Sequence, residues 1–533
     1  MANKASALEF TTMTDQGSLL AALGVRSDVP QLTYIYQYLH ALGITTVVVE
    51  PAYFDRDYLQ EFSAFYSLSA RGYPNYCKRA HFFNEPVDRQ LIISAAGRSA
   101  ESAARLQKAY RGFTVIRPIE SAPFGRTVLP WYPDKYEDIN PRIVTPSRDY
   151  ECHLCGITLT VFGLAWQQQD QGVSACATIG LWTMLHSSAF SERYAIPTTV
   201  AITQAAHKNL SLGYRTFPSH HLAPEQVCEA VKEFGLSPYL VEGDEEMPAQ
   251  NSNYDKPFSK DRFCNIIASL VRSGFPCTII GEVIRQGETT RGGHMNVCVG
   301  YRSQPSLRHD QVFADEDLLA LYIHDDNIGP AVRFTVKNYD TGEAKITDNP
   351  NHPICLVPDN PQDGSNEAAG DYGFFIPGTI LVAVENDLRT SADSLILMAG
   401  ELRQLVVDVA SVDAKKRSVA IPTITVGMQY ATAAEFSMEM LKERLSDNPA
   451  ILARARMDLV EKVGPVSLYV GVVRIGDENG AIVDVLCDTT DNDNIHPVFA
   501  SVCYDPKYAG FLSIINKENS DVFGAIIDGY SKA

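Results

Sequence analysis

In the middle of the chain, the spacing of the apolar residues changes once, from that of helices to that of strands. This single change limits the folds that the segment can adopt. Segments with the spacing of buried or amphipathic helices come first, and apolar runs of strand length follow them. Helices are expected at 174–190, 225–235 and 260–274, and strands at 276–283, 294–302 and within 318–330. A run of helices followed by a run of strands indicates an α+β domain rather than an alternating α/β one.

Both ends of the chain mix helices and strands and predict further domains. At the N-terminal end, residues 31–42 have helical spacing, 44–50 read as a buried strand, and 112–165 are rich in strand-like runs. Near the other end, a Pro-, Asp- and Gly-rich segment at 358–371 reads as a connector, and 467–488 read as a hairpin. We therefore expect an N-terminal α/β domain at 1–145, a central domain at 146–350 and a C-terminal α/β domain at 370–533.

Length and charge exclude several classes of protein. A chain of 533 residues is too long for one hydrophobic core, which agrees with several domains. Its formal charge of -19 disfavours binding to nucleic acid or to anionic membranes. The N-terminal residues lack the apolar segment of a secretory signal, and the eleven cysteines are scattered rather than densely paired. We expect a cytoplasmic protein with reduced cysteines, whose oligomeric state the sequence leaves open.

Cys176 is the candidate nucleophile. It follows a run of glutamines and Gly172, and it opens the apolar segment expected to be a helix. The peptide dipoles and free N–H groups at a helix start favour a thiolate there. A lone cysteine in this position is more often a packed side chain, so the assignment needs a base and an acid elsewhere in the chain.

His294 and the acidic residues that follow it could supply these groups. His294 begins a predicted strand after two glycines, and Asp325 and Asp326 lie at the end of the next predicted strand. Either carboxylate could accept the imidazole N–H and orient the ring for general base catalysis. A preceding glutamine could donate to a developing oxyanion, and Gln169 is favoured over Gln171.

The order of these motifs resembles the papain-like cysteine peptidases. More narrowly, it resembles the group that includes the bacterial double-glycine leader peptidases: a Gln, a Cys opening an apolar helix, a GH before an apolar strand that ends in GY, and a strand that ends in Asp. The resemblance covers roughly 146–345 and departs from the group at Ala177, where a glycine is usual. It implies a core in which a helix bundle packs on an antiparallel sheet.

The resemblance also implies a function. It predicts a cysteine hydrolase that cleaves a peptide or isopeptide amide in a peptide or protein substrate, with Cys176, His294, Asp325 and Gln169 as catalytic residues. No metal or organic cofactor is expected. The same groups could instead serve an acyltransferase, a transglutaminase or a deamidase, because an amine can replace water as the acceptor. A third reading is a catalytically inactive module that binds a protein partner.

Overall fold

The computed structural model divides the chain into two compact units. It describes residues 7–134, 136–190, 196–209, 215–244, 256–285, 291–304, 311–340, 345–347, 349–359, 372–490, 497–519 and 521–530. The first unit comprises Met1–Phe258, Gly274–Arg302 and Ala320–Ala383, and the second comprises Ser259–Ser273, Ser303–Leu319 and Val384–Ala533. The chain therefore enters the second unit three times, and residue 145, the expected domain boundary, lies inside the first unit.

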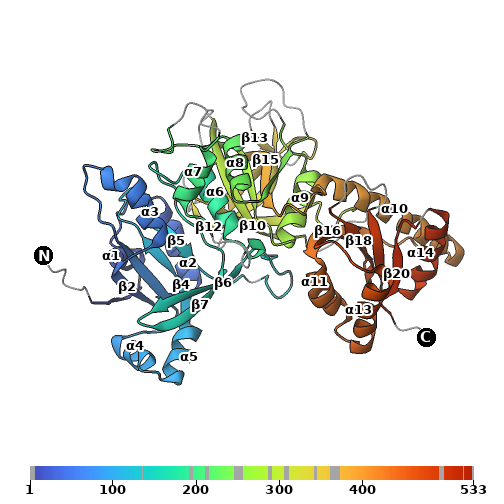
Figure 1. Cartoon of the computed structure of the whole chain (residues 1–533), viewed down its shortest axis with the longest axis horizontal. Helices are drawn as coiled ribbons and strands as arrows, with labels where there is room; N and C mark the ends of the chain where they lie inside the picture. Colours follow the sequence, from blue (N-terminus) through green and yellow to red (C-terminus); the bar gives the residue numbers. More distant parts are fainter. Residues whose placement is uncertain are drawn as a thin grey trace. The chain divides into compact units, whose positions relative to one another are not determined.

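An antiparallel sheet of five strands begins the first unit (Figure 1). Its strands pair in chain order: β1 (Glu9–Thr12), β2 (Thr46–Tyr53), β3 (Cys77–Phe83), β4 (Tyr110–Ile116) and β5 (Phe124–Val128). The helices of this region are α1 (Gln16–Leu23), α2 (Gln31–Ala41), α3 (Arg56–Ala64), α4 (Arg89–Ala96) and α5 (Ala100–Ala109). The helix predicted at 31–42 and the strand at 44–50 are confirmed as α2 and β2. Helix α3 starts where the Asp55 carboxylate accepts the N–H groups of Asp57 and Tyr58.

The α/β class predicted for both ends of the chain is wrong, because an α/β domain has mainly parallel strands and these sheets are mainly antiparallel. Every pairing in the N-terminal sheet is antiparallel. In the sheet of the second unit, among the described strands, only the β19–β20 pairing is parallel. A helix between two strands permits a parallel crossover but does not require one, because the chain can also return in the opposite direction beside the first strand. Both regions are α+β, like the centre of the chain.

The larger sheet of the first unit closes on itself. Six strands form an antiparallel ring in the order β11, β10, β9, β15, β14 and β12, because β12 also pairs with β11. They are β9 (Cys277–Ile284), β10 (Arg291–Ser303), β11 (Leu318–Asp325), β12 (Gly329–Asp340), β14 (Ile354–Asp359) and β15 (Phe374–Val384). The short strands β8 (Ser237–Glu242) and β13 (Lys345–Thr347) pair with β15 and β12. The strands predicted from 276 to 330 are therefore confirmed as β9, β10 and β11.

Helix α6 (Cys176–Leu185) packs against this ring. All nine helix residues after Cys176 are buried. Gly180 permits a close approach to the sheet, because a Cβ atom there would lie 2.9 Å from the Met295 sulfur and 3.4 Å from Thr278 Cγ2. The contact places the helix beside β9 and β10. Helices α7 (Thr199–Ala206) and α8 (Pro224–Glu233) pack against one another and against α6.

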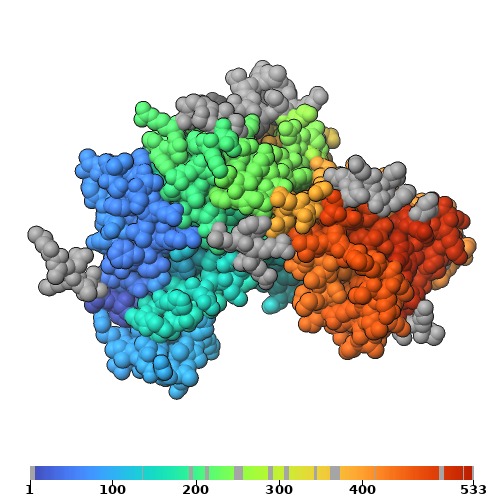
Figure 2. Space-filling model, viewed as in Figure 1, coloured from blue at the N-terminus to red at the C-terminus, as the bar shows by residue number. Residues whose placement is uncertain are grey.

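The N-terminal region and the closed ring belong to one unit and are in direct contact. Helix α3 contacts α7, and α2 contacts β12. A hairpin of β6 (Arg148–Leu154) and β7 (Ile157–Gly163) contacts α5, β4 and β5 through its second strand. In Figure 2 the N-terminal residues (blue) and the following segments of the first unit (teal and green) form one continuous surface.

The second unit has a five-stranded sheet with helices. The sheet order is β16 (Thr425–Thr432), β17 (Tyr469–Asp477), β18 (Gly480–Asp488), β19 (Val498–Cys503) and β20 (Ala525–Asp528). The hairpin predicted at 467–488 is confirmed as β17 and β18. Helices α12 (Leu441–Leu445) and α13 (Pro449–Val463) form one apolar core with the sheet. Helices α9 (Lys260–Arg272), α10 (Ala392–Arg417) and α14 (Pro506–Glu518) contact other parts of it.

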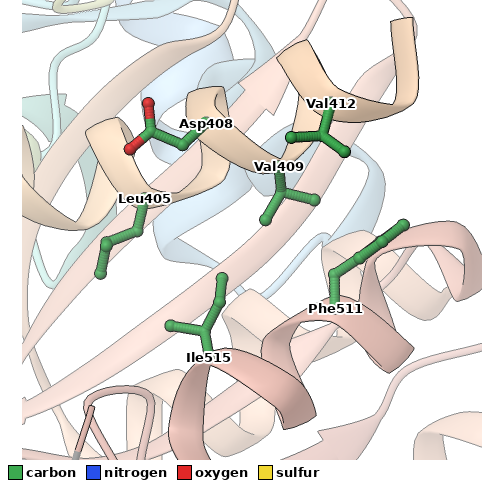
Figure 3. Close-up of a pocket in the computed structure, with 6 residues that line it drawn as sticks. All are labelled: Leu405, Asp408, Val409, Val412, Phe511 and Ile515. Atoms are coloured by element: carbon green, nitrogen blue, oxygen red, sulfur yellow. The ribbon is translucent and has the colours of Figure 1, made fainter. Parts of the chain in front are cut away.

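An open apolar groove of about 220 Å³ lies between α10 and α14 (Figure 3). It is lined by Leu405, Asp408, Val409, Val412, Phe511 and Ile515. These side chains include one carboxylate and no nucleophile, so the groove is not the candidate catalytic site. No helix in the described part of the chain has both the length and the apolar character needed to cross a bilayer.

Candidate active site

Cys176 is the first residue of α6, at a helix start that no side chain caps. Its N-cap residue, Ala175, has an extended backbone and makes no side-chain hydrogen bond. Among the eleven cysteines nine are buried, Cys155 is exposed and Cys176 is intermediate. The free N–H groups of a first helical turn attract negative charge. The position therefore combines solvent access with a helix start, as reactive cysteines require.

His294 lies on β10, opposite Gly281 of β9. Its side chain is buried and hydrogen-bonded to the side chains of Asp325 and Cys176. Burial lowers the pKa of His294, but the two carboxylates Asp325 and Asp326 and these hydrogen bonds outweigh it, so the pKa lies well above its usual value of 6.5. The imidazole is thereby held as a proton donor beside the thiol.

Asp325, the last residue of β11, is the carboxylate that fixes the imidazole. Its Oδ2 lies 3.3 Å from His294 Nε2, and its Oδ1 accepts the N–H groups of Asn327 (2.8 Å) and Ile328 (3.1 Å). The Asp325 carbonyl accepts the Trp166 indole N–H at 3.0 Å. Because both carboxylate oxygens and the backbone are held, Asp325 can orient the ring. Since Nε2 faces Asp325, Nδ1 is the nitrogen left for the thiol.

Asp326 faces the same imidazole but is held differently. Its Oδ1 lies 3.5 Å from His294 Nε2, and among the described residues neither of its oxygens has a hydrogen-bond donor of good geometry. Burial raises its pKa to about 7, the Asp325 charge adds to the rise, and His294 opposes it. Of the two acids that the sequence left as alternatives, Asp325 makes the hydrogen bond.

The glutamines before Cys176 have different environments, and Gln169 is the one that is connected to His294, through Asn327. Gln169 Nε2 donates to Asn327 Oδ1 at 2.9 Å, and Asn327 Nδ2 lies 3.2 Å from His294 Nε2. Gln171, the alternative, is exposed. The structure thus brings the predicted residues Cys176, His294, Asp325 and Gln169 into one neighbourhood.

No protein-family model matches this chain, and no curated protein matches it at a significant level.

A buried ion cluster holds the segment that leads to Cys176. Arg117 Nη1 lies 3.2 Å from Glu61 Oε2 and 3.0 Å from Asp170 Oδ2, and all three side chains are at most 2% exposed. Asp170 Oδ1 accepts the N–H groups of residues 172–174. Glu61 accepts from Gln167 Nε2 at 3.3 Å and from the Ser174 hydroxyl at 3.0 Å. Both ends of the segment that carries Gln169 are therefore attached to the same cluster.

The two carboxyl groups of this cluster, Glu61 and Asp170, have different pKa values. The pKa of Glu61 is raised to about 7, first by burial and then by the Asp170 charge, although Arg117 opposes the rise. Burial also acts on Asp170, but Arg117 and the three backbone N–H groups keep its pKa below the usual value. Near neutral pH, Asp170 is therefore the ionised partner of Arg117, and Glu61 is the acid that takes up a proton.

Sequence reasoning missed Asn327 and the ion cluster. Asn327 directly follows the two candidate acids, so the run Asp325–Asn327 was a local signal that three polar side chains end one strand. Glu61 and Arg117 lie on segments of the N-terminal sheet region and gave no such signal. Asp170 is next to Gln169, but its role depends on Arg117, which is 53 residues earlier in the chain.

Proposed function

We propose that this chain is a cysteine hydrolase that cleaves a peptide or isopeptide amide, with Cys176 as the nucleophile. One observation carries the proposal: the His294 side chain is hydrogen-bonded both to Cys176, at the start of a helix, and to Asp325, at the end of a strand. A nucleophile, a proton carrier and an orienting acid in this order form the arrangement of cysteine and serine hydrolases.

The first half of the reaction forms a thioester. His294 takes the Cys176 proton, the resulting thiolate attacks the carbonyl carbon of the substrate, and the carbonyl π electrons move to oxygen. Gln169 has a second amide hydrogen beyond the one given to Asn327, so it can donate to this oxyanion together with the backbone N–H of Cys176. His294 then gives a proton to the leaving nitrogen, the C–N bond breaks, and the amine departs.

The second half regenerates the enzyme. Neutral His294 accepts a proton from a water molecule while the water oxygen attacks the thioester carbon. The C–S bond breaks, the acid product leaves, and the thiolate and the imidazolium are restored. Asp325 keeps Nε2 engaged throughout, which leaves Nδ1 free for each proton transfer.

The architecture also supports the papain-like interpretation made from the sequence. A buried helix that begins at the cysteine packs against a closed antiparallel sheet that carries the histidine and the acid. The resemblance implies a helix bundle packed on an antiparallel sheet, and the packing of α6 on antiparallel strands supports this part of the interpretation. The N-terminal region is an addition to this core. It contributes Glu61 on α3 and Arg117 after β4, which hold the loop that carries Gln169.

Alkylation tests the proposal without knowledge of the substrate. Iodoacetamide at neutral pH should modify Cys176 faster than Cys155, although Cys155 is the more exposed thiol. His294→Ala should slow the modification of Cys176 by about tenfold or more and leave Cys155 unchanged. Mass spectrometry of the peptides that contain each cysteine measures both rates. Equal rates at the two cysteines in the wild-type protein would remove the basis of the proposal.

Turnover provides the second test. A library of fluorogenic peptide amides should be cleaved by the wild-type protein and by the control variant Cys155→Ala, and not by Cys176→Ala, whose loss of activity should be on the order of a thousandfold or more. Product masses distinguish hydrolysis, which adds water, from transfer to an amine. Cleavage by purified Cys176→Ala at the wild-type rate would exclude this cysteine as the nucleophile.

A further inference from the structure

The Asp326 carboxylate is the least satisfied polar group beside His294. It is 3% exposed, and neither oxygen has a hydrogen-bond donor of good geometry in the described part of the chain. Its contact with His294 Nε2, at 3.5 Å, is shared with Asp325, which already holds the same nitrogen at 3.3 Å. A buried carboxylate without donors is energetically costly. Such a group calls for an explanation, and a bound ion is one of the few available.

We propose that His294 Nε2 and the carboxylates of Asp325 and Asp326 form a binding site for Zn²⁺ that switches the catalytic centre off. The three ligand atoms lie within 4.8 Å of one another, and all three residues are buried. Tetrahedral zinc, with bonds of about 2.0–2.2 Å to nitrogen and oxygen, needs ligand atoms roughly 3.3–3.6 Å apart. Two of the three separations, 3.3 and 3.5 Å, already have this length.

Ligand type and charge agree with zinc. An imidazole nitrogen favours zinc and its transition-metal neighbours, whereas an all-oxygen set favours magnesium or calcium. Two ionised carboxylates neutralise one divalent cation, so the ion removes the like-charge repulsion between Asp325 and Asp326. The ion takes the imidazole in its neutral form. Zinc therefore gives Asp326 a direct ligand bond in place of its 3.5 Å contact with His294 Nε2.

Asn327 offers a fourth ligand and connects the ion to the oxyanion donor. Its Nδ2 lies 3.2 Å from His294 Nε2, so rotation of the amide by half a turn brings Oδ1 to this position. The rotation breaks the hydrogen bond that Asn327 Oδ1 accepts from Gln169 Nε2 at 2.9 Å. Zinc binding would thus displace Gln169 as well as occupy the histidine.

The inhibitory part of this inference rests on the proposed function. With zinc on Nε2, His294 carries its remaining proton on Nδ1 and cannot accept another one from water. Asp325 binds the ion and no longer orients the ring. The base and the oxyanion donor are therefore disabled together, while the Cys176 thiol remains chemically intact. Removal of the ion by a chelator restores the resting arrangement.

Direct binding tests the site independently of any activity. The full-length protein, purified with a chelator and then freed of it, is titrated with Zn²⁺ in competition with a chromophoric zinc indicator. We expect one tight site in the wild-type protein and in Cys176→Ala, and a loss of affinity of about tenfold or more in Asp326→Asn. The asparagine is nearly isosteric and removes a buried charge, so the variant should fold, which a thermal melt checks. Loss of zinc in Cys176→Ala with retention in Asp326→Asn would place the ion at the thiol and overturn the proposal.

Cobalt gives a measurement that needs no variant. Co²⁺ bound to the wild-type protein should show visible bands of a nitrogen and oxygen site, without the near-ultraviolet charge-transfer band of a cobalt–thiolate bond. A strong charge-transfer band at one equivalent of Co²⁺ would contradict the assigned ligands. Mg²⁺ in large excess should not displace the Co²⁺, because it favours oxygen ligands.

Inhibition separates the two proposals. Zinc should inhibit peptide cleavage by the wild-type protein at the concentration at which it binds. In Asp326→Asn the zinc concentration that halves the rate, measured against that variant's own zinc-free rate, should rise about tenfold or more. If zinc binds as described but no cleavage is found with any peptide, the proposed function fails and the site stands. If cleavage is found and zinc neither binds nor inhibits, the zinc site fails and the hydrolase stands.

Discussion

Gln169 and Gln171 are two positions apart but have different environments. Gln169 donates to Asn327, which contacts His294, and Gln171 is exposed. Gln169→Ala should therefore lower kcat by roughly 100- to 1,000-fold, as expected for the loss of an oxyanion donor, with a small effect on KM. Gln171→Ala is the matched control and should keep the wild-type kcat. Steady-state kinetics on one peptide amide measures both, and equal losses in the two variants would contradict the assignment.

Substitution of the two adjacent carboxylates, Asp325 and Asp326, should have different effects on kcat. Asp325 is hydrogen-bonded to His294 Nε2 and to two backbone N–H groups, whereas Asp326 has no comparable donor in the described chain. Asp325→Asn should reduce kcat on the order of 100- to 10,000-fold, because an amide that donates to the ring no longer holds the reactive tautomer. Asp326→Asn in chelator-treated buffer is the comparison. A larger loss in Asp326→Asn would show that Asp326 is the orienting acid.

At the scale of elements, the loop before α6 depends on residues of the N-terminal sheet region. Glu61 lies on α3, Arg117 directly follows β4, and together with Asp170 they hold residues 167–174. These contacts join the N-terminal region to the loop before α6 within the first unit. The residues that hold this loop are far from it in the sequence, so no short motif around Cys176 includes them.

The same cluster predicts a pH dependence of stability. The pKa of Glu61 is raised to about 7 in the folded protein, chiefly by burial, above an unfolded value near 4.3. Its protonated form therefore contributes stability that is fully present below about pH 4.3 and is lost as the pH rises through about 7. Glu61→Gln cannot titrate, so the stability of the wild-type protein relative to Glu61→Gln should fall between pH 5 and pH 8.

Urea unfolding of the two proteins at about pH 5 and pH 8 measures this difference. Glu50→Gln is a suitable control, because Glu50 also pairs with a buried arginine, Arg79, but its pKa is lowered in the folded protein by hydrogen bonds to His81 and Arg79 that outweigh its burial. The stability of Glu50→Gln relative to the wild-type protein should change little between these two pH values, because a carboxyl with a lowered pKa titrates below about pH 4.3. A Glu61→Gln protein whose stability parallels the wild type across this range would show that Glu61 stays ionised.

At the scale of the whole molecule, the second unit is assembled from three separate segments. Helix α9 belongs to it although the chain returns to the first unit at Gly274 directly after the segment that carries this helix. Arg262 on α9 is paired with Asp393 on α10 at 2.9 Å. Most of α9 is buried, with contacts to α10 and β16. The C-terminal segment therefore cannot be removed without leaving an apolar helix uncovered.

Truncation after residue 384 tests this organisation. The shortened chain should aggregate, or bind an apolar dye more strongly than the full-length protein, because α9 loses α10 and β16. Size-exclusion chromatography and dye fluorescence measure the two outcomes. A monomeric fragment with unchanged dye binding would show that α9 packs elsewhere and that the two units are separable.

Local patterns of the sequence were enough to predict many of the elements that carry the site. The apolar spacing predicted α2, α6, α8 and α9 and the strands β9, β10 and β11, and it placed Cys176 at a helix start and His294 on a strand. These predictions succeed because periodicity and turn residues act over a few neighbouring positions. The direction of the flanking strands was not predictable in this way, because it depends on how each connection returns to the sheet.

The partners of each side chain were decided by the tertiary structure alone. Packing selected Gln169 over Gln171, gave Asp325 rather than Asp326 the hydrogen bond to His294, and joined Arg117 to Asp170. The residues of these pairs lie between 31 and 158 positions apart in the chain. A hydrogen bond over such a separation forms only after the sheets and helices between its partners have closed, because its direction and length depend on the packing of all of them.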